Sequence, residues 1–108
     1  MKLLELFSGT GSVGEPFRAQ GHEVLSVDVD GRFLQPGDIQ KDILQLNYNS
    51  LPWVPDVLWG SPPCTEYSRA KTRGHRNLAL ADRLVAKWVE IRDYFLGLNP
   101  NMLWFCEN

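Results

Sequence analysis

Short apolar runs alternate with turn-forming and helical segments along the chain. The apolar runs cover 3–7, 22–30, 55–60 and 102–108, and each has the length of a buried strand. A glycine-rich turn, SGTGSVG, follows the first run. We expect a short helix after this turn, with Pro16 tolerated in its first turn and an end near Gly21. A further short strand is predicted within 37–46.

The clearest helix is predicted over residues 78–96. Its apolar residues recur at steps of three and four and line up on one face: Leu84, Trp88, Ile91, Phe95 and Leu98. Gly97 and the Asn99–Pro100 pair are expected to end the helix. A helix of this kind covers one face of a sheet with its apolar stripe.

The alternation of strands and helices predicts an α/β fold with a parallel sheet of about five strands and flanking helices. In such open sheets, ligands bind beyond the carboxyl ends of the strands. The unusual residues of the chain lie at these predicted ends: the glycine-rich turn, Asp28, Asp42, Cys64, and Glu107 with Asn108. We therefore expect them to converge on one site.

Composition narrows the class of protein. A chain of 108 residues with 44% hydrophobic residues fits one domain with a modest core. No secretory signal or membrane-spanning run is apparent, so we expect an intracellular chain with reduced thiols and no membrane partner. The net charge of −2 does not by itself indicate nucleic acid, but 69–83 holds five basic residues against one acid. Such a segment is more often a solvated loop than a phosphate-binding site.

The glycine-rich turn and Asp28 form a modest signal for a nucleoside-type cofactor. Glycines let the backbone approach a ligand closely, and a carboxylate at the end of the second strand can accept hydrogen bonds from ribose hydroxyls. Asp42 is placed to accept from an adenine amino group. A helix cap or a solvated loop acid is an equally good interpretation of Asp42 alone.

The two cysteines differ in their surroundings. Cys64 follows two prolines in a polar turn, with Arg69 and Lys71 nearby, and positive charge favours the reactive thiolate. Cys106 lies inside an apolar run and is expected to be a small buried hydrophobic residue.

Three motifs give the chain a family resemblance. LFSGTGSVG is similar to the cofactor motif of DNA (cytosine-5)-methyltransferases, SPPCTEYS resembles their Pro-Cys nucleophile motif, and the terminal Glu-Asn resembles the start of their Glu-Asn motif. Their order and spacing match across all 108 residues. The chain looks like the N-terminal portion of the catalytic domain, and its short spacing looks most like compact phage and prophage enzymes.

The resemblance implies a Rossmann-like fold, a cytoplasmic enzyme, S-adenosylmethionine as cofactor, cytosine-containing DNA as substrate and no metal. It makes Cys64 the nucleophile and Glu107 the carboxyl group that holds the cytosine ring. Phe7 would stack on adenine, Asp28 would hold the ribose, and Asp42 with Ile43 would hold the adenine. The implied cofactor contacts are Phe7, Ser8, Gly9, Thr10, Gly11, Asp28, Val29, Asp42, Ile43 and Pro63. The implied DNA contacts are Ser68, Arg69, Lys71, Arg73 and Arg76.

The sequence also departs from the family pattern. Ser12 replaces a motif glycine, Thr65 replaces a glutamine, and the family's Gln-x-Arg-x-Arg segment and target-recognition domain are not found. We therefore expect a fragment that self-associates, binds DNA weakly and is inactive without a complementing C-terminal chain. Two alternatives remain: an amino-methyltransferase, whose motif differs from SPPC at the cysteine, and a non-catalytic remnant that binds cofactor or DNA.

Overall fold

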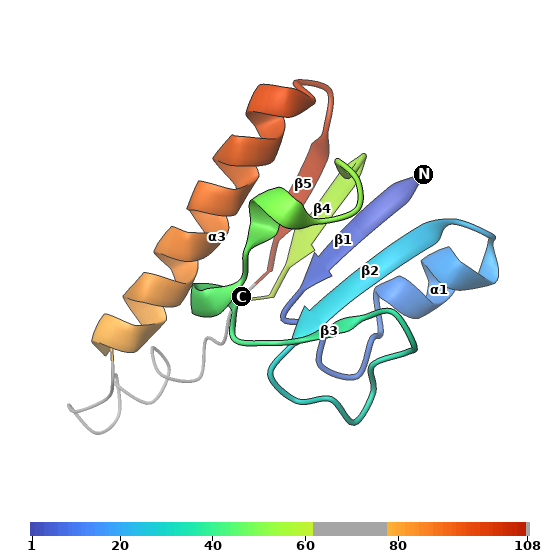
Figure 1. Ribbon diagram of the computed structural model, residues 1–108, viewed down its shortest axis with the longest axis horizontal. Helices are drawn as coiled ribbons and strands as arrows, with labels where there is room; N and C mark the ends of the chain where they lie inside the picture. The colour runs from blue at the N-terminus through green and yellow to red at the C-terminus, as the bar shows by residue number, and fades with distance from the viewer. Residues whose placement is uncertain (62–77, 108) are drawn as a thin grey trace.

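A parallel sheet is the framework of the molecule (Figure 1). The structure, a computed structural model, describes residues 1–61 and 78–107. Within these ranges the strands are β1 (Lys2–Leu6), β2 (Glu23–Asp28), β3 (Ile39–Gln40), β4 (Val57–Gly60) and β5 (Leu103–Cys106). The helices are α1 (Gly14–Ala19) and α3 (Leu78–Leu98), with short 3₁₀ turns η1 (Ile43–Gln45) and η2 (Tyr48–Ser50).

The strand order is β3-β2-β1-β4-β5, and every neighbouring pair is parallel. The first strand is central, and the chain winds outward from it in both directions. This order places a topological switch point between β1 and β4, where open α/β sheets bind their ligands. The predicted α/β class and five-strand parallel sheet are confirmed.

One face of the sheet packs against α3. The pleat directs alternate side chains of each strand to this face, and they form a buried cluster with the helix: Leu4, Leu6, Leu25, Val27, Leu58, Trp88, Ile91 and Phe95. The predicted apolar stripe is therefore confirmed for Trp88, Ile91 and Phe95. It was wrong for Leu98, which is exposed because the end of α3 extends past the starts of β1 and β4 (Figure 1). The helix also runs through Gly97 and ends at Leu98 rather than at residue 96.

The opposite face carries α1, which covers β1 and β2. Its first residue, Gly14, packs against Glu5 and Val24 of these strands. Glu5 is only 1% exposed, so this face of the sheet contains a buried carboxyl group beneath the short helix.

Strand β5 forms an edge of the sheet in the described part of the chain. Leu103, Trp104 and Phe105 are 54%, 43% and 47% exposed. Cys106 is exposed too, so the prediction that it is a buried hydrophobic residue was wrong. Among the residues that the structure describes, Cys106 lies on an edge strand, which has a neighbouring strand on one side only. Its side chains are therefore covered less completely than those of a central strand.

Candidate functional site

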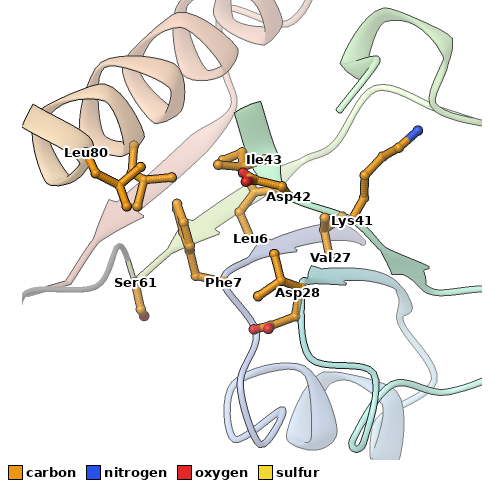
Figure 2. Close-up of a pocket in the computed structure, with 11 residues that line it drawn as sticks. Leu6, Phe7, Val27, Asp28, Lys41, Asp42, Ile43, Ser61 and Leu80 are labelled. Carbon is orange, nitrogen blue, oxygen red and sulfur yellow. The ribbon is translucent and has the colours of Figure 1, made fainter. Parts of the chain in front are cut away.

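A cavity of about 350 Å³ opens at the carboxyl ends of β1 and β2 (Figure 2). It lies between these ends, the segment that leads into η1, and the first turns of α3. Its lining residues are Leu6, Phe7, Val27, Asp28, Val29, Lys41, Asp42, Ile43, Ser61, Leu80 and Leu84. The cavity therefore has the size and largely apolar lining typical of small-molecule sites, with two carboxylates, Asp28 and Asp42, in that lining.

Phe7 enters the cavity because of an unusual backbone conformation. Its φ is 56°, in the left-handed region that non-glycine residues rarely adopt. This turn at the end of β1 directs the ring between Leu80 of α3 on one side and Asp42 with Ile43 on the other (Figure 2). Strain of this kind is found at ligand-binding positions, where the surrounding structure maintains it.

The turn after Phe7 folds tightly beside the cavity. Gly9 and Gly11 have φ values of 54° and 79°, which glycine adopts without steric cost. The Gly11 N–H donates to the Ser8 carbonyl at 2.8 Å, and the Glu15 N–H donates to the Gly11 carbonyl at 2.9 Å, which joins the turn to α1. The Ser8 hydroxyl is buried and has no hydrogen-bond partner among the described residues.

Asp28 ties this turn to the end of β2. Its Oδ2 accepts the Gly9 N–H at 2.7 Å, and its Oδ1 accepts the Asp30 N–H at 2.8 Å. A carboxylate offers about four lone-pair positions, so two remain for a ligand. The same side chain can thus shape the turn and accept hydrogen bonds from a bound diol.

Asp42 begins the short turn η1. Its Oδ1 accepts the Leu44 N–H at 2.9 Å, so the sequence-based interpretation of a cap is correct. Oδ2 makes no hydrogen bond within 1–61 and 78–107, and Ile43 is buried beside it. The cap and a ligand-binding role are therefore compatible, because one oxygen caps the turn and Asp42 also lines the cavity.

Five of the predicted cofactor residues line the cavity: Phe7, Asp28, Val29, Asp42 and Ile43. Ser8, Gly9, Thr10 and Gly11 form the adjoining turn and are not part of the lining. The sequence analysis missed Leu6, Val27, Lys41, Ser61, Leu80 and Leu84. The side chain of Lys41 extends away from the cavity (Figure 2). Leu84 was predicted only as part of the apolar stripe, and Leu80 was not singled out, since a helical pattern does not reveal which strand ends the helix lies beside.

The ends of β4 and β5 meet next to this cavity. The Glu107 N–H donates to the Gly60 carbonyl at 2.9 Å, so Glu107 stands beside the residue that precedes Ser61. The Trp59 indole donates to the Ser61 hydroxyl at 2.9 Å. The predicted residues Pro63, Cys64, Ser68, Arg69, Lys71, Arg73, Arg76 and Asn108 lie outside the described residues.

The described residues show no sign of a membrane or metal site. None of their helices combines the length and apolar composition needed to cross a membrane. Within the same ranges, no group of three or more His, Cys, Asp or Glu side chains is arranged to hold a metal ion.

No protein-family model matches the chain, but comparison with known proteins finds similar sequences and structures. The sequence is 35% identical over 74 residues to a Frog virus 3 protein described as a "Probable DNA (cytosine-5)-methyltransferase". That alignment covers 66% of this chain and 32% of the viral protein. The chain thus spans about a third of the length of this curated relative.

A solved structure shares the fold. It is a crystal structure of an E. coli protein described as a "putative DNA modification methyltransferase encoded within prophage". It superposes with a TM-score of 0.50 at 20% identity, covering 93% of this chain and 38% of the other. The described sheet and helices therefore follow the architecture of a methyltransferase domain.

Proposed function

Because this chain belongs to the DNA (cytosine-5)-methyltransferase family, we propose that it binds S-adenosylmethionine in the cavity and takes part in methylating carbon 5 of cytosine in DNA. The observation that carries the proposal is the joint placement of Phe7, Asp28 and Asp42 around one cavity at the carboxyl ends of β1 and β2. An aromatic face and two carboxylates are the groups that recognise an adenine ring, a ribose and an amino group.

The lining fits the adenosine part of this cofactor. The ring of Phe7 offers a stacking surface, and Ile43 extends the apolar wall. Asp28 keeps two lone-pair positions for the vicinal hydroxyls of a ribose. Oδ2 of Asp42 can accept a hydrogen bond from the adenine amino group.

The turn 8–11 fits the methionine part. Its positive-φ glycines bring the backbone close to the cavity without side chains in the way. The buried Ser8 hydroxyl supplies a polar group beside this backbone. Ser8, Gly9, Thr10 and Gly11 would thus contact the ligand mainly through main-chain atoms.

The bound cofactor would supply a methyl group on a positively charged sulfur. The chain would supply the nucleophile: the Cys64 thiolate forms a bond to carbon 6 of cytosine and makes carbon 5 nucleophilic. After methyl transfer to carbon 5, the carbon 5 proton would pass to solvent water, the bond between carbon 6 and the Cys64 sulfur would break, and the aromatic ring and the thiolate would be restored. The carboxyl group of Glu107, beside Gly60 at the end of β4, would hold the ring nitrogen and amino group while charge develops.

Access to carbon 6 requires the base to leave the duplex, at a cost of a few kcal/mol. Ser68, Arg69, Lys71, Arg73 and Arg76 are the candidates for contacts with the DNA backbone. Contacts of this kind position the protein without reading sequence. Because the chain spans about a third of its viral relative, target recognition is proposed to come from residues that this sequence does not contain, on the same or a complementing chain.

Calorimetric titration with S-adenosylmethionine tests the cofactor proposal. The chain should bind it, and Asp28→Ala should weaken binding by roughly tenfold or more, because a carboxylate–hydroxyl interaction is worth about 1.5–3 kcal/mol. The matched control is Asp30→Ala, which removes an exposed acid of the same loop that pairs with Arg32. Equal loss in both variants, or no binding by a folded wild-type chain, would contradict the proposal.

A further inference from the structure

A polar network lies beneath the turn, on the face of the sheet opposite the cavity. The Glu5 carboxylate accepts the Gly14 N–H at 3.0 Å and the Ser26 hydroxyl at 2.8 Å. Arg18 of α1 donates to both oxygens of Asp38 at 2.8 and 2.9 Å. Asp38 also accepts the Ser26 N–H at 2.9 Å, so the network joins β1, β2, α1 and the segment before β3.

The fit between Glu5 and Gly14 is unusually close. A Cβ at residue 14 would lie 2.6 Å from Oε1 of Glu5 and 3.1 Å from Cγ1 of Val24. The φ of Gly14 is not in the left-handed region, so space and not backbone conformation requires glycine here. The absence of a side chain at residue 14 lets the carboxylate reach the main chain at the point where the turn becomes α1.

We propose that Glu5 is a positioning residue for cofactor binding: from the far side of the sheet, its carboxylate fixes the turn 8–13 through the Gly14 amide. Two side-chain carboxylates attach the turn, and they act at its opposite ends. Asp28 holds Gly9 on the cavity side, and Glu5 holds Gly14 on the α1 side. With both attachments in place, the backbone of Ser8 to Gly11 is held at one position beside the cavity. The inference rests on the proposed function for the identity of the ligand.

The charge state of Glu5 decides the strength of this attachment. Burial raises the pKa of the Glu5 carboxyl above its ordinary value of 4.5, and its hydrogen bonds with Ser26, Gly14 and Val13 and the charge of Arg18 act against this rise. The charged groups facing it are Arg18 and, through Arg18, Asp38. An ionised carboxylate accepts all these N–H and O–H donors at once, and such charge-assisted bonds are the stronger ones. The turn is therefore fixed most firmly when Glu5 is ionised.

Three variants separate positioning from general stability. Glu5→Gln keeps the shape of the side chain and removes its charge. Glu15→Gln is the matched control, because it removes an exposed acid from the first turn of α1. Ser26→Ala removes one donor and keeps the carboxylate, which provides a second variant if Glu5→Gln does not fold.

The first measurement is amide NMR and does not depend on any ligand. In the wild type and in Glu15→Gln, the Gly14 amide shift should titrate with a midpoint above 4.5, and in Glu5→Gln it should not titrate. Hydrogen exchange at Gly11 and Gly14 should become about tenfold faster in Glu5→Gln. Unchanged exchange and a Gly14 shift that still titrates in Glu5→Gln would overturn the positioning role.

The second measurement is calorimetry with S-adenosylmethionine at pH values below and above the midpoint found for the Gly14 amide. Wild-type affinity should rise with pH through the midpoint found for Gly14, and Glu5→Gln should bind about tenfold more weakly at neutral pH without this step. Ser26→Ala should show a smaller loss in the same direction. If the wild type binds and Glu5→Gln binds equally well, the positioning role is wrong. If the wild type does not bind although the Gly14 amide titrates, the proposed function fails and the attachment of the turn stands.

Discussion

The indole of Trp88 lies directly over the backbone of Gly60, so closely that a Cβ at residue 60 would overlap its Nε1. Trp88 is buried in the center of the core, and Gly60 is the last residue of β4. The contact therefore sets how closely α3 approaches the strand end that leads to Ser61 and that accepts the Glu107 N–H. Gly60 thus takes part both in the packing of Trp88 and in the strand end that positions Ser61 and Glu107.

Gly60→Ala should destabilise the fold, because Trp88 must move and take α3 with it. Overpacking of this kind costs about 1–3 kcal/mol, and urea unfolding would measure the loss. Gly97→Ala is the control. Gly97 lies in α3, the helix that carries Trp88, and a Cβ there would meet open space. This substitution should therefore raise the free energy of unfolding by about 0.5–1 kcal/mol. Equal effects of the two substitutions would show that the Trp88 contact does not determine how closely α3 packs against the end of β4.

Phe7→Ala should weaken binding of S-adenosylmethionine without unfolding the chain. Stacking of a base on an aromatic ring is worth about 1–3 kcal/mol, so the affinity should fall by roughly tenfold or more. Phe33→Ala removes an exposed ring outside the cavity lining and serves as the control in the same calorimetric titration. An unchanged affinity of Phe7→Ala would place the adenine elsewhere.

Glu5 should make stability depend on pH in a direction opposite to that of most carboxylates. Because burial raises its pKa in the folded state, its favourable contribution is present below 4.5 and is lost as the pH rises through the folded value. The free energy of unfolding of the wild type, relative to that of Glu5→Gln, should therefore decline over this interval. Urea titrations of both proteins at several pH values would measure it, and a difference that grows with pH would contradict the raised pKa.

Under the proposed mechanism, Cys64→Ser should abolish covalent trapping on DNA that contains 5-fluorocytosine, because it removes the thiolate that is proposed to add to carbon 6. The assay requires these 108 residues joined to the C-terminal part of a complete enzyme of the family. Cys106→Ser is the matched control, since Cys106 is an exposed thiol on β5. Methyl transfer that survives in Cys64→Ser would favour an amino-methyltransferase.

The exposed apolar strand β5 should promote self-association of the isolated chain. Edge strands with apolar side chains on both faces pair readily with other chains. Phe105→Lys should reduce association seen in sedimentation velocity, whereas Phe33→Lys, away from this edge, should not. A monomeric wild-type chain at high concentration would remove the basis for this prediction.

The sequence predicted the fold through two local signals. Short apolar runs and a 3.6-residue stripe mark strands and a helix without knowledge of what surrounds them, so β1, β2, β4 and α3 were expected close to their observed bounds. The burial of side chains at the edge of the sheet and at the end of α3 could not be predicted from the sequence. Cys106 and Leu98 carry the same apolar pattern as core residues, but their exposure depends on which neighbours the sheet provides.

Site residues could be predicted from the sequence where they lie next to the glycine-rich or polar residues that mark the end of a strand. Phe7 and Asp28 adjoin the ends of strands, and their placement around one cavity follows from parallel topology. Glu5 was missed because it is a single acid in an apolar run, and its partners Gly14 and Ser26 are distant in sequence. Such a contact depends on register between strands, which no local pattern encodes.

The central place of β1 also orders the events of folding. Leu4 pairs with Leu25, about twenty residues later, and with Leu58, more than fifty residues later. During synthesis, β1, β2 and β3 can therefore associate well before β4 and α3 leave the ribosome, while the apolar face that Trp88 and Phe95 will cover still faces water. Contacts of such long sequence separation form slowly, because the chain between them must first lose its freedom. Until α3 is added, the nascent first half therefore exposes apolar surface of the kind that makes folding intermediates prone to aggregation.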